Sequence, residues 1–251
     1  MAVEKDKSND KTESSNSSIC KKAAGIKAFV FDMDGLLFDS ERIVQRSWEI
    51  AGDELGIPHM GDVIYHTLGM NRAGRNEYFR KYIREDFPFE EFGELTRDNF
   101  WKIVDKEGLP LKRGAKELLA YGKAQGYKMA VATSSSREYA MGNLIRAGID
   151  SYFDNVICGD MVKKAKPDPE IYQKACESLG IPPADCMAFE DAPGGILSAH
   201  QAGMQVIMVP DLVQPTEEIR NLTYRVCDSL ADVIGDGKSG FFPVPGGFQA
   251  R

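Results

Sequence analysis

Two carboxylates stand two positions apart at the end of an apolar segment. Asp32 and Asp34 come directly after residues 27–31, and the sequence continues as GLLFDSE. A carboxylate at the buried end of a strand is costly unless a cation compensates its charge. Carboxylate oxygens suit Mg²⁺, which takes one or two such ligands and keeps several waters. A turn that leaves a strand would also use aspartates, but it does not explain the longer run DGLLFDSE.

Four hydroxyl side chains follow a second apolar segment. They come directly after residues 128–132 and just before a predicted helix, and they are Thr133, Ser134, Ser135 and Ser136. Hydroxyl groups and free backbone N–H groups at the N-terminus of a helix can bind an anion. Capping of that helix by Ser136 needs only one hydroxyl. The other three therefore favour an anion site.

A lysine and a second pair of acids could complete such a site. Three lysines precede a proline-started helix, namely Lys163, Lys164 and Lys166, and solvent exposure alone explains at least one of them. Glu190 and Asp191 end another apolar segment and are followed by glycines. Acids that hold a divalent metal, opposite hydrogen-bond donors, are typical of a phosphate-transfer site. The condition is that all four segments meet at one edge of a sheet.

Near-continuous apolar segments predict the strands that would bring these residues together. The segments are residues 27–31, 128–132, 155–158, 186–189 and 205–209. Helical patterns separate the later ones at residues 112–125, 137–147, 169–179 and 195–202, with Asp168 as the N-cap of the third. Such apolar strands are typical of a parallel sheet buried on both faces. The alternation predicts an α/β fold, with a Rossmann-like open parallel sheet and helices on both faces.

One interval is too long for a single strand–helix–strand unit. Phe31 and Lys128 enclose far more than the roughly 30 residues that such a unit needs. Helical patterns in this interval lie at residues 41–55, 74–84 and 90–106. They predict a small α-helical cap domain inserted at residues 40–110. Because ligands of open α/β sheets bind at the carboxyl ends of the strands, the insertion is placed to act as a lid.

The remaining segments define the rest of the domain organisation. We expect an α/β core domain of residues 23–39 and 111–235, a flexible tail at residues 1–22 and an irregular C-terminal extension at residues 236–251. The extension contains Phe241 and Phe242, which would be unusual in solvent, so we expect this part to dock on the core.

Composition narrows the class of partner and the compartment. A net charge of −7 argues against nucleic acid as a partner. No run of 18 apolar residues exists, so we expect no membrane span, and the start lacks the apolar run of a secretory signal. The five cysteines form no CxxC pair, and four lie in apolar segments, which favours a reducing, cytoplasmic environment. We expect a monomer that binds a small molecule.

Four motifs in a fixed order resemble those of one enzyme superfamily. The segments FDMDGLLFDSE, VATSSS, KPDPEIY and FEDAPGGI are similar to the motifs of the haloacid dehalogenase-like hydrolases. Within that superfamily, the chain resembles the phosphatase and β-phosphoglucomutase group, which carries a helical cap after the first motif. The resemblance covers roughly residues 25–234.

The resemblance implies a role for each matched residue. Asp32 matches the nucleophile that forms an aspartyl-phosphate, and Asp34 matches the general acid/base that protonates the leaving alkoxide and then activates water. Lys166 matches the lysine that neutralises charge on the nucleophile and the phosphoryl group.

The remaining matched residues concern phosphate and metal. Thr133 and Ser134 match the phosphate-binding motif. Asp191, together with Glu190, matches the acidic motif that holds Mg²⁺ alongside Asp32 and the Asp34 carbonyl.

The cap region bears on two activities that the resemblance leaves open. In β-phosphoglucomutases a histidine follows the DS or DT pair by a few residues, whereas the matching position here is Val44. Val44 also lies on the apolar stripe of its predicted helix, so packing explains it. This favours a phosphatase. Gly69, Asn71 and Arg72 resemble the cap loop that contacts substrate, although Arg72 could equally be a solvated arginine.

We therefore predict a Mg²⁺-dependent phosphatase of a small phosphorylated metabolite, such as a sugar phosphate or a nucleoside monophosphate. A β-phosphoglucomutase-like phosphosugar mutase is the alternative enzyme. A third hypothesis is a non-catalytic protein that binds a phosphorylated ligand, and the presence of both Asp32 and Asp34 argues against it.

Overall fold

Six parallel strands form the main sheet of the protein. The computed structural model describes residues 25–67, 72–235 and 242–243 of the chain. The strand order is β3-β2-β1-β4-β5-β6. The strands are β1 (Ala28–Phe31), β2 (Lys128–Ala132), β3 (Asn155–Ile157), β4 (Cys186–Glu190), β5 (Gln205–Met208) and β6 (Arg225–Val226). The first five confirm the predicted segments, whereas β6 was not predicted because two residues are too short for an apolar pattern.

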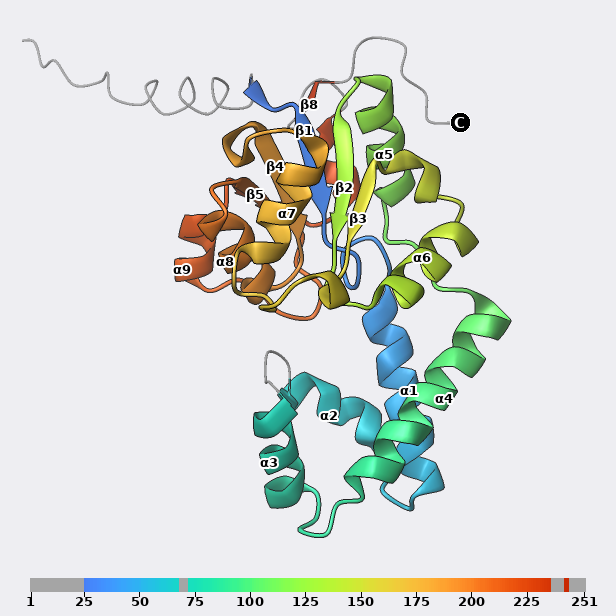
Figure 1. The fold of residues 1–251 in the computed structure, drawn as a ribbon. Helices are drawn as coiled ribbons and strands as arrows, with labels where there is room; N and C mark the ends of the chain where they lie inside the picture. The colour runs from blue at the N-terminus through green and yellow to red at the C-terminus, as the bar shows by residue number, and fades with distance from the viewer. Residues whose placement is uncertain (1–24, 68–71, 236–241, 244–251) are drawn as a thin grey trace, which may run out of the picture.

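Helices cover both faces of this sheet (Figure 1). They are α5 (Ala115–Ala124), α6 (Arg137–Arg146), α7 (Glu170–Leu179), α8 (Pro193–Gln201) and α9 (Glu217–Leu222). Alternate residues of β1 point to opposite faces, as strand geometry requires. Phe29 joins the hydrophobic cluster that contains Leu118 of α5, and Val30 joins the one that contains Ile171 of α7. Burial on both sides confirms the predicted α/β class with a Rossmann-like parallel sheet.

The start of α7 differs from the prediction by one residue. Pro169 is the N-cap rather than the first helical residue, and the helix begins at Glu170. Asp168 still contributes, because its Oδ1 accepts a hydrogen bond from the backbone N–H of Glu170 at 3.1 Å. The side chain of Asp168 therefore accepts a hydrogen bond from the backbone two residues later, as in an Asx turn, and the helix begins only after this turn.

Four helices lie apart from the sheet, below its lower edge in Figure 1. They are α1 (Ser40–Glu54), α2 (Met60–Thr67), α3 (Arg72–Tyr82) and α4 (Phe89–Glu107). A hydrophobic cluster of their own includes Trp48, against which the rings of Phe79 and Phe92 pack edge-on, each at 5.6 Å. Three of these helices were predicted, but the short α2 was not. The cap boundaries at residues 40 and 110 remain a prediction.

The two chain segments that connect the cap to the core run side by side. Phe38 and Leu111 form an antiparallel bridge. The backbone N–H of Asp39 donates to the carbonyl of Pro110 at 2.9 Å, and that of Lys112 donates to the carbonyl of Leu37 at 2.8 Å. This pairing places the cap next to the end of β1.

A short segment of the predicted C-terminal extension docks on the core. Strand β8 (Phe242–Pro243) pairs with β7 (Ile234–Gly235). Phe242 is 2% exposed, and its ring centroid lies 5.0 Å from that of Phe29. Docking is thus confirmed for Phe242, while Phe241 lies outside the described residues.

Two further observations concern the cysteines and the helix lengths. Four cysteines are free and buried, as expected of small core residues: Cys158, Cys176, Cys186 and Cys227. Cys20 lies outside the described residues. Among the helices of the described ranges, none combines the length and apolar character that a membrane span requires.

Candidate active site

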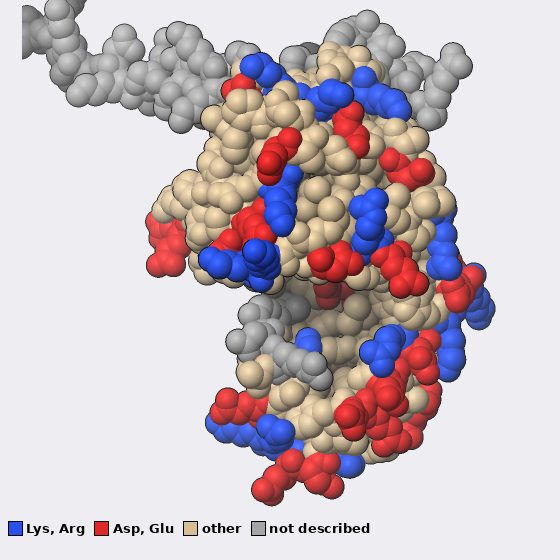
Figure 2. All heavy atoms as spheres, in the orientation of Figure 1, with Lys and Arg blue, Asp and Glu red and all other residues tan. Residues whose placement is uncertain are grey.

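Three of the predicted functional residues, Asp32, Thr133 and Glu190, lie where three neighbouring strands end. β1 lies between β2 and β4, and all three run parallel. Asp32 follows β1, Thr133 follows β2 and Glu190 ends β4. The carboxyl ends of these strands face the cap (Figure 1), and a hollow separates core from cap on the face shown in Figure 2. This is the edge at which open α/β sheets bind ligands.

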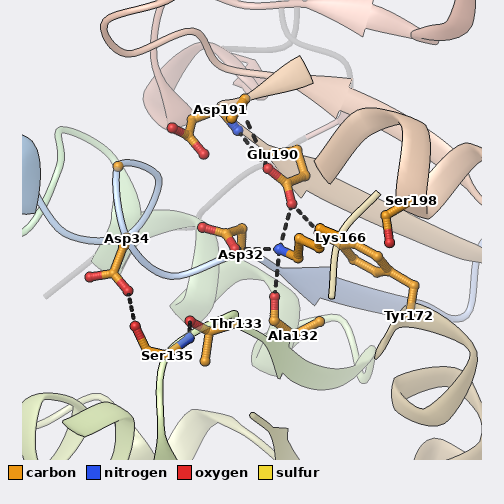
Figure 3. Close-up of polar contacts among 12 residues, drawn as sticks. Asp32, Asp34, Ala132, Thr133, Ser135, Lys166, Tyr172, Glu190, Asp191 and Ser198 are labelled. Carbon is orange, nitrogen blue, oxygen red and sulfur yellow. Dashed lines mark hydrogen bonds and ion pairs between the residues drawn. The ribbon is translucent and has the colours of Figure 1, made fainter. Parts of the chain in front are cut away.

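Lys166 occupies the centre of the site (Figure 3). Its Nζ donates to Oδ1 of Asp32 at 2.5 Å, to Oε1 of Glu190 at 2.7 Å and to the carbonyl of Ala132 at 2.9 Å. Burial of the ammonium group would lower its pKa, but the charges of Asp32 and Glu190 outweigh this and raise the pKa of Lys166. Lys166 is therefore a permanent cation between two acids.

Three carboxylates form a compact acidic cluster. Asp32, Glu190 and Asp191 each offer one oxygen, and these oxygens lie within 4.8 Å of one another. Burial raises the pKa of Asp32 to about 7 against the opposing charge of Lys166, and the charge of Glu190 contributes to this rise. Burial, followed by the charges of Asp32 and Glu190, raises the pKa of Asp191 well above its usual range. A cation among these oxygens would relieve the repulsion, and hard oxygen donors are the ligands that Mg²⁺ prefers.

Two glycines leave room for the acidic cluster. Gly35 has a φ of 82°, and a Cβ on it would collide with the carboxylate of Asp191. A Cβ on Gly195, near the start of α8, would collide with the carboxylate of Glu190. The glycines of the first and last motifs are therefore needed for close approach to the acids.

Tyr172 also holds Glu190 in place. Its Oη donates to Oε1 of Glu190 at 2.6 Å, and both residues are buried. Tyr172 is the last residue of the motif KPDPEIY, so its position was visible in the sequence, but its contact with Glu190 was not.

Asp34 lies beside the cluster but is turned away from Asp32 (Figure 3). Its Oδ2 accepts a hydrogen bond from Oγ of Ser135 at 2.7 Å, and its Oδ1 accepts one from Oη of Tyr139 at 3.1 Å. Burial raises the pKa of Asp34, and these two hydrogen bonds oppose the rise. Tyr139 is a contact that sequence reasoning missed, because it belongs to no motif.

The four hydroxyl side chains of residues 133–136 make different contacts. Thr133 is buried, and its Oγ1 accepts from the backbone N–H of Ser135 at 3.1 Å. The side chain of Ser134 is exposed. Ser136 caps α6 by accepting from the backbone N–H of Tyr139, as predicted. The loop thus places Ser135 against Asp34, and Thr133 holds the backbone of Ser135.

The predicted cap residues are described only in part. Gly69 and Asn71 lie outside the described residues, and Arg72 begins α3 with its side chain outside them. Val44 packs against the aromatic cluster of the cap, which agrees with the packing explanation.

Comparisons with known proteins point to one family. The family model for haloacid dehalogenase-like hydrolases matches residues 26–203. The curated "Putative phosphatase YhcW" of Bacillus subtilis is 32% identical over 212 residues, which are 83% of this chain and 94% of that protein. The "Phosphorylated carbohydrates phosphatase" of Thermotoga maritima is 31% identical over 182 residues, which are 72% of this chain and 84% of that protein.

A solved structure agrees with these relatives. The crystal structure of a "putative beta-phosphoglucomutase from Thermotoga maritima" matches with a TM-score of 0.71 and 25% identity, covering 83% of this chain and 96% of that chain.

The protein is an α/β protein with a helical cap, and the acids and the lysine at the carboxyl edge of its parallel sheet form a site suited to phosphate transfer. The chain belongs to the haloacid dehalogenase-like hydrolases. It is a phosphoric monoester hydrolase that acts on phosphorylated substrates.

Proposed function

We propose that the protein is a Mg²⁺-dependent phosphatase of a small phosphorylated metabolite, either a sugar phosphate or a nucleoside monophosphate. The observation that carries the proposal is the contact of Lys166 with both Asp32 and Glu190, with Asp191 beside them. A buried lysine and three acids at one point can bind a phosphate dianion together with a cation. The phosphatase named for phosphorylated carbohydrates among the relatives supports this substrate class.

Asp32 is the nucleophile in this proposal. Its Oδ1 is bound to Lys166, so Oδ2 is the oxygen that attacks phosphorus. The new bond joins Oδ2 to phosphorus, while the bond from phosphorus to the ester oxygen breaks. The leaving alkoxide takes a proton from the carboxylic acid of Asp34. The products of this step are a free alcohol and an aspartyl-phosphate.

Hydrolysis of the aspartyl-phosphate uses the same two residues. Asp34, now a carboxylate, takes a proton from water, and the water oxygen attacks phosphorus. The bond between phosphorus and Asp32 breaks, which restores the carboxylate and releases inorganic phosphate. Lys166 and the Ser134 loop bind the phosphoryl oxygens in both steps, with Thr133 supporting the loop.

The acidic cluster suits a resident metal. Asp32, Glu190 and Asp191, with the backbone carbonyl of Asp34, would hold Mg²⁺. When bound, the ion supplies positive charge to the phosphoryl oxygens.

A phosphosugar mutase is the second candidate, because solved β-phosphoglucomutase-like structures share the fold. Val44 at the histidine position of those mutases favours the phosphatase. Incubation with β-glucose 1-phosphate separates the two. A phosphatase releases inorganic phosphate, whereas a mutase yields glucose 6-phosphate.

We also propose that the protein is a monomer in the cytoplasm. The cytoplasmic location is in keeping with the four free, buried thiols.

Replacement of the nucleophile tests the proposal. The variant Asp32→Asn should lose phosphate release from p-nitrophenyl phosphate by roughly a thousandfold or more. Asp185→Asn is the control, because Asp185 pairs with Lys27 at the surface and should leave the rate unchanged. EDTA should abolish wild-type turnover and Mg²⁺ should restore it. Full activity of Asp32→Asn would refute the mechanism, and no release by the wild-type enzyme would favour a non-catalytic phospholigand-binding protein. A screen of phosphorylated metabolites then identifies the substrate.

A further inference from the structure

Tyr139 contacts both the cap and the residue assigned as the general acid/base. It lies on α6 in the core. Its hydroxyl donates to Oδ1 of Asp34 at 3.1 Å. Its ring centroid lies 5.5 Å from that of Trp101 and 6.1 Å from that of Phe100, both on α4 of the cap. One side chain thus has its ring on the cap and its polar end on Asp34.

The orientation of Asp34 in the structure is not the one that catalysis needs. Its carboxylate points toward Ser135 and away from Asp32 (Figure 3). Both oxygens are engaged, one by Ser135 at 2.7 Å and the other by Tyr139. To exchange a proton with a group on phosphorus beside Asp32, the carboxylate must turn away from these donors. Each hydrogen bond to the carboxylate therefore opposes the turn.

The packing around Tyr139 allows its hydroxyl to be held or released. A hollow of about 540 Å³ lies beside the ring, with Trp101 and Arg146 on its walls. Further along the same contact between α4 and α6, Arg146 forms an ion pair with Asp105 at 3.1 Å. The ring of Tyr139 therefore packs against α4 on one side and faces the hollow on another, where it has room to move. A shift of α4 would displace the residues against which the ring packs.

We propose that Tyr139 is a positioning residue that holds Asp34 in the withdrawn orientation while its ring rests on α4. The inference rests on the proposed role of Asp34. The step that this contact restrains is hydrolysis of the aspartyl-phosphate. In that step Asp34 takes a proton from water, the water oxygen bonds to phosphorus, and the bond from phosphorus to Asp32 breaks.

The variant Tyr139→Phe tests the inference, because it keeps the ring and removes only the hydroxyl. The enzyme is labelled with p-nitrophenyl [³²P]phosphate and chased with unlabelled substrate, and the decay of the acid-stable phosphoenzyme is followed. We expect decay to accelerate about tenfold to a hundredfold, the range for loss of one hydrogen bond to a charged group. The kcat/KM for p-nitrophenyl phosphate should stay within about twofold, because an aryl leaving group departs without a proton.

Two further variants separate positioning from general packing. Trp101→Leu removes part of the ring support and should accelerate decay by a smaller factor than Tyr139→Phe. Asp105→Asn is the matched control, because it breaks the ion pair of the same α4–α6 contact without touching Tyr139, and it should leave decay unchanged. Thermal unfolding of each variant verifies that it is folded.

Three results would overturn the inference. Unchanged decay of the phosphoenzyme in Tyr139→Phe would mean that the hydroxyl does not hold Asp34 in the withdrawn orientation. Slower decay with an equal fall in kcat/KM would mean that Tyr139 supports the fold or the substrate. Equal acceleration by Asp105→Asn would assign the effect to the whole contact. If the wild-type enzyme forms no phosphoenzyme, the proposed function fails and the inference fails with it. If the wild-type enzyme forms a phosphoenzyme and the phosphoenzyme of Tyr139→Phe decays at the same rate, the inference alone fails.

Discussion

The Nζ atom of Lys166 lies 2.5 Å from Oδ1 of Asp32, although 134 positions separate the two residues in the sequence. Both side chains are only 10% exposed. The contact fixes one oxygen of Asp32 and leaves the other for chemistry. It also balances part of the charge of an acidic cluster that would otherwise be costly to bury.

Replacement of Lys166 by methionine should therefore affect both stability and activity. Removal of one partner from a buried ion pair leaves an uncompensated charge, so we expect a loss of about 3 kcal/mol in the free energy of unfolding with EDTA present. Mg²⁺ should reduce this loss, because a cation would again balance the acids. Urea unfolding with and without Mg²⁺ measures the effect. A variant as stable as wild type in EDTA would show that Lys166 does not balance the cluster.

Two adjacent glycines in α8 provide a matched pair of variants. A Cβ on Gly195 would collide with the carboxylate of Glu190, whereas a Cβ on Gly194 has no atom within 4 Å. Gly195→Ala should displace Glu190 and lower kcat/KM by roughly a hundredfold. Gly194→Ala should leave activity unchanged and stabilise the helix by about 1 kcal/mol. Equal activity of the two variants would contradict the geometry of the acidic cluster.

The stability of the metal-free protein should fall as pH rises. The pKa of Asp32 is raised by burial to about 7, above the value of 3.8 expected in the unfolded chain, and that of Asp191 is raised as well. Between about pH 4 and pH 7 the unfolded state releases these protons first, so the free energy of unfolding declines. Each pKa unit corresponds to about 1.4 kcal/mol, which puts the decline at a few kcal/mol.

Thermal unfolding at pH 5 and pH 8 measures this decline. In EDTA the midpoint should be lower at pH 8, and saturating Mg²⁺ should raise it more at pH 8 than at pH 5. The Asp32→Asn variant serves as the control and should decline less, because one of the acids is gone. A wild-type midpoint in EDTA that is higher at pH 8 than at pH 5 would contradict the assigned pKa directions.

The C-terminal docking segment should contribute to stability but not to chemistry. Phe242 is buried against Phe29 and lies outside the site. Phe242→Ala should cost about 3 kcal/mol in the free energy of unfolding, as for other buried phenylalanines. The kcat/KM measured well below the unfolding midpoint should not change. A loss below about 0.5 kcal/mol would show that the segment does not pack as described.

Three of the motif residues could be placed from the sequence because each of them lies at the end of a predicted strand. Asp32, Thr133 and Glu190 follow apolar runs, and parallel strands bring their carboxyl ends to one edge. The contact between Tyr139 and Asp34 could not be predicted, because it spans 105 positions and depends on how α6 packs. The short α2 and β6 were missed for a different reason, since a few residues carry too little periodicity.

Chemical trapping of the phosphoenzyme identifies the residue that carries the phosphoryl group. Wild-type enzyme is mixed with substrate and Mg²⁺, quenched in acid and digested, and the peptides are analysed by mass spectrometry. We expect one phosphate on the peptide that contains Asp32, and we expect none in Asp32→Asn or in samples with EDTA. Phosphate on another residue, or turnover with no labelled peptide in the wild-type enzyme, would contradict this expectation.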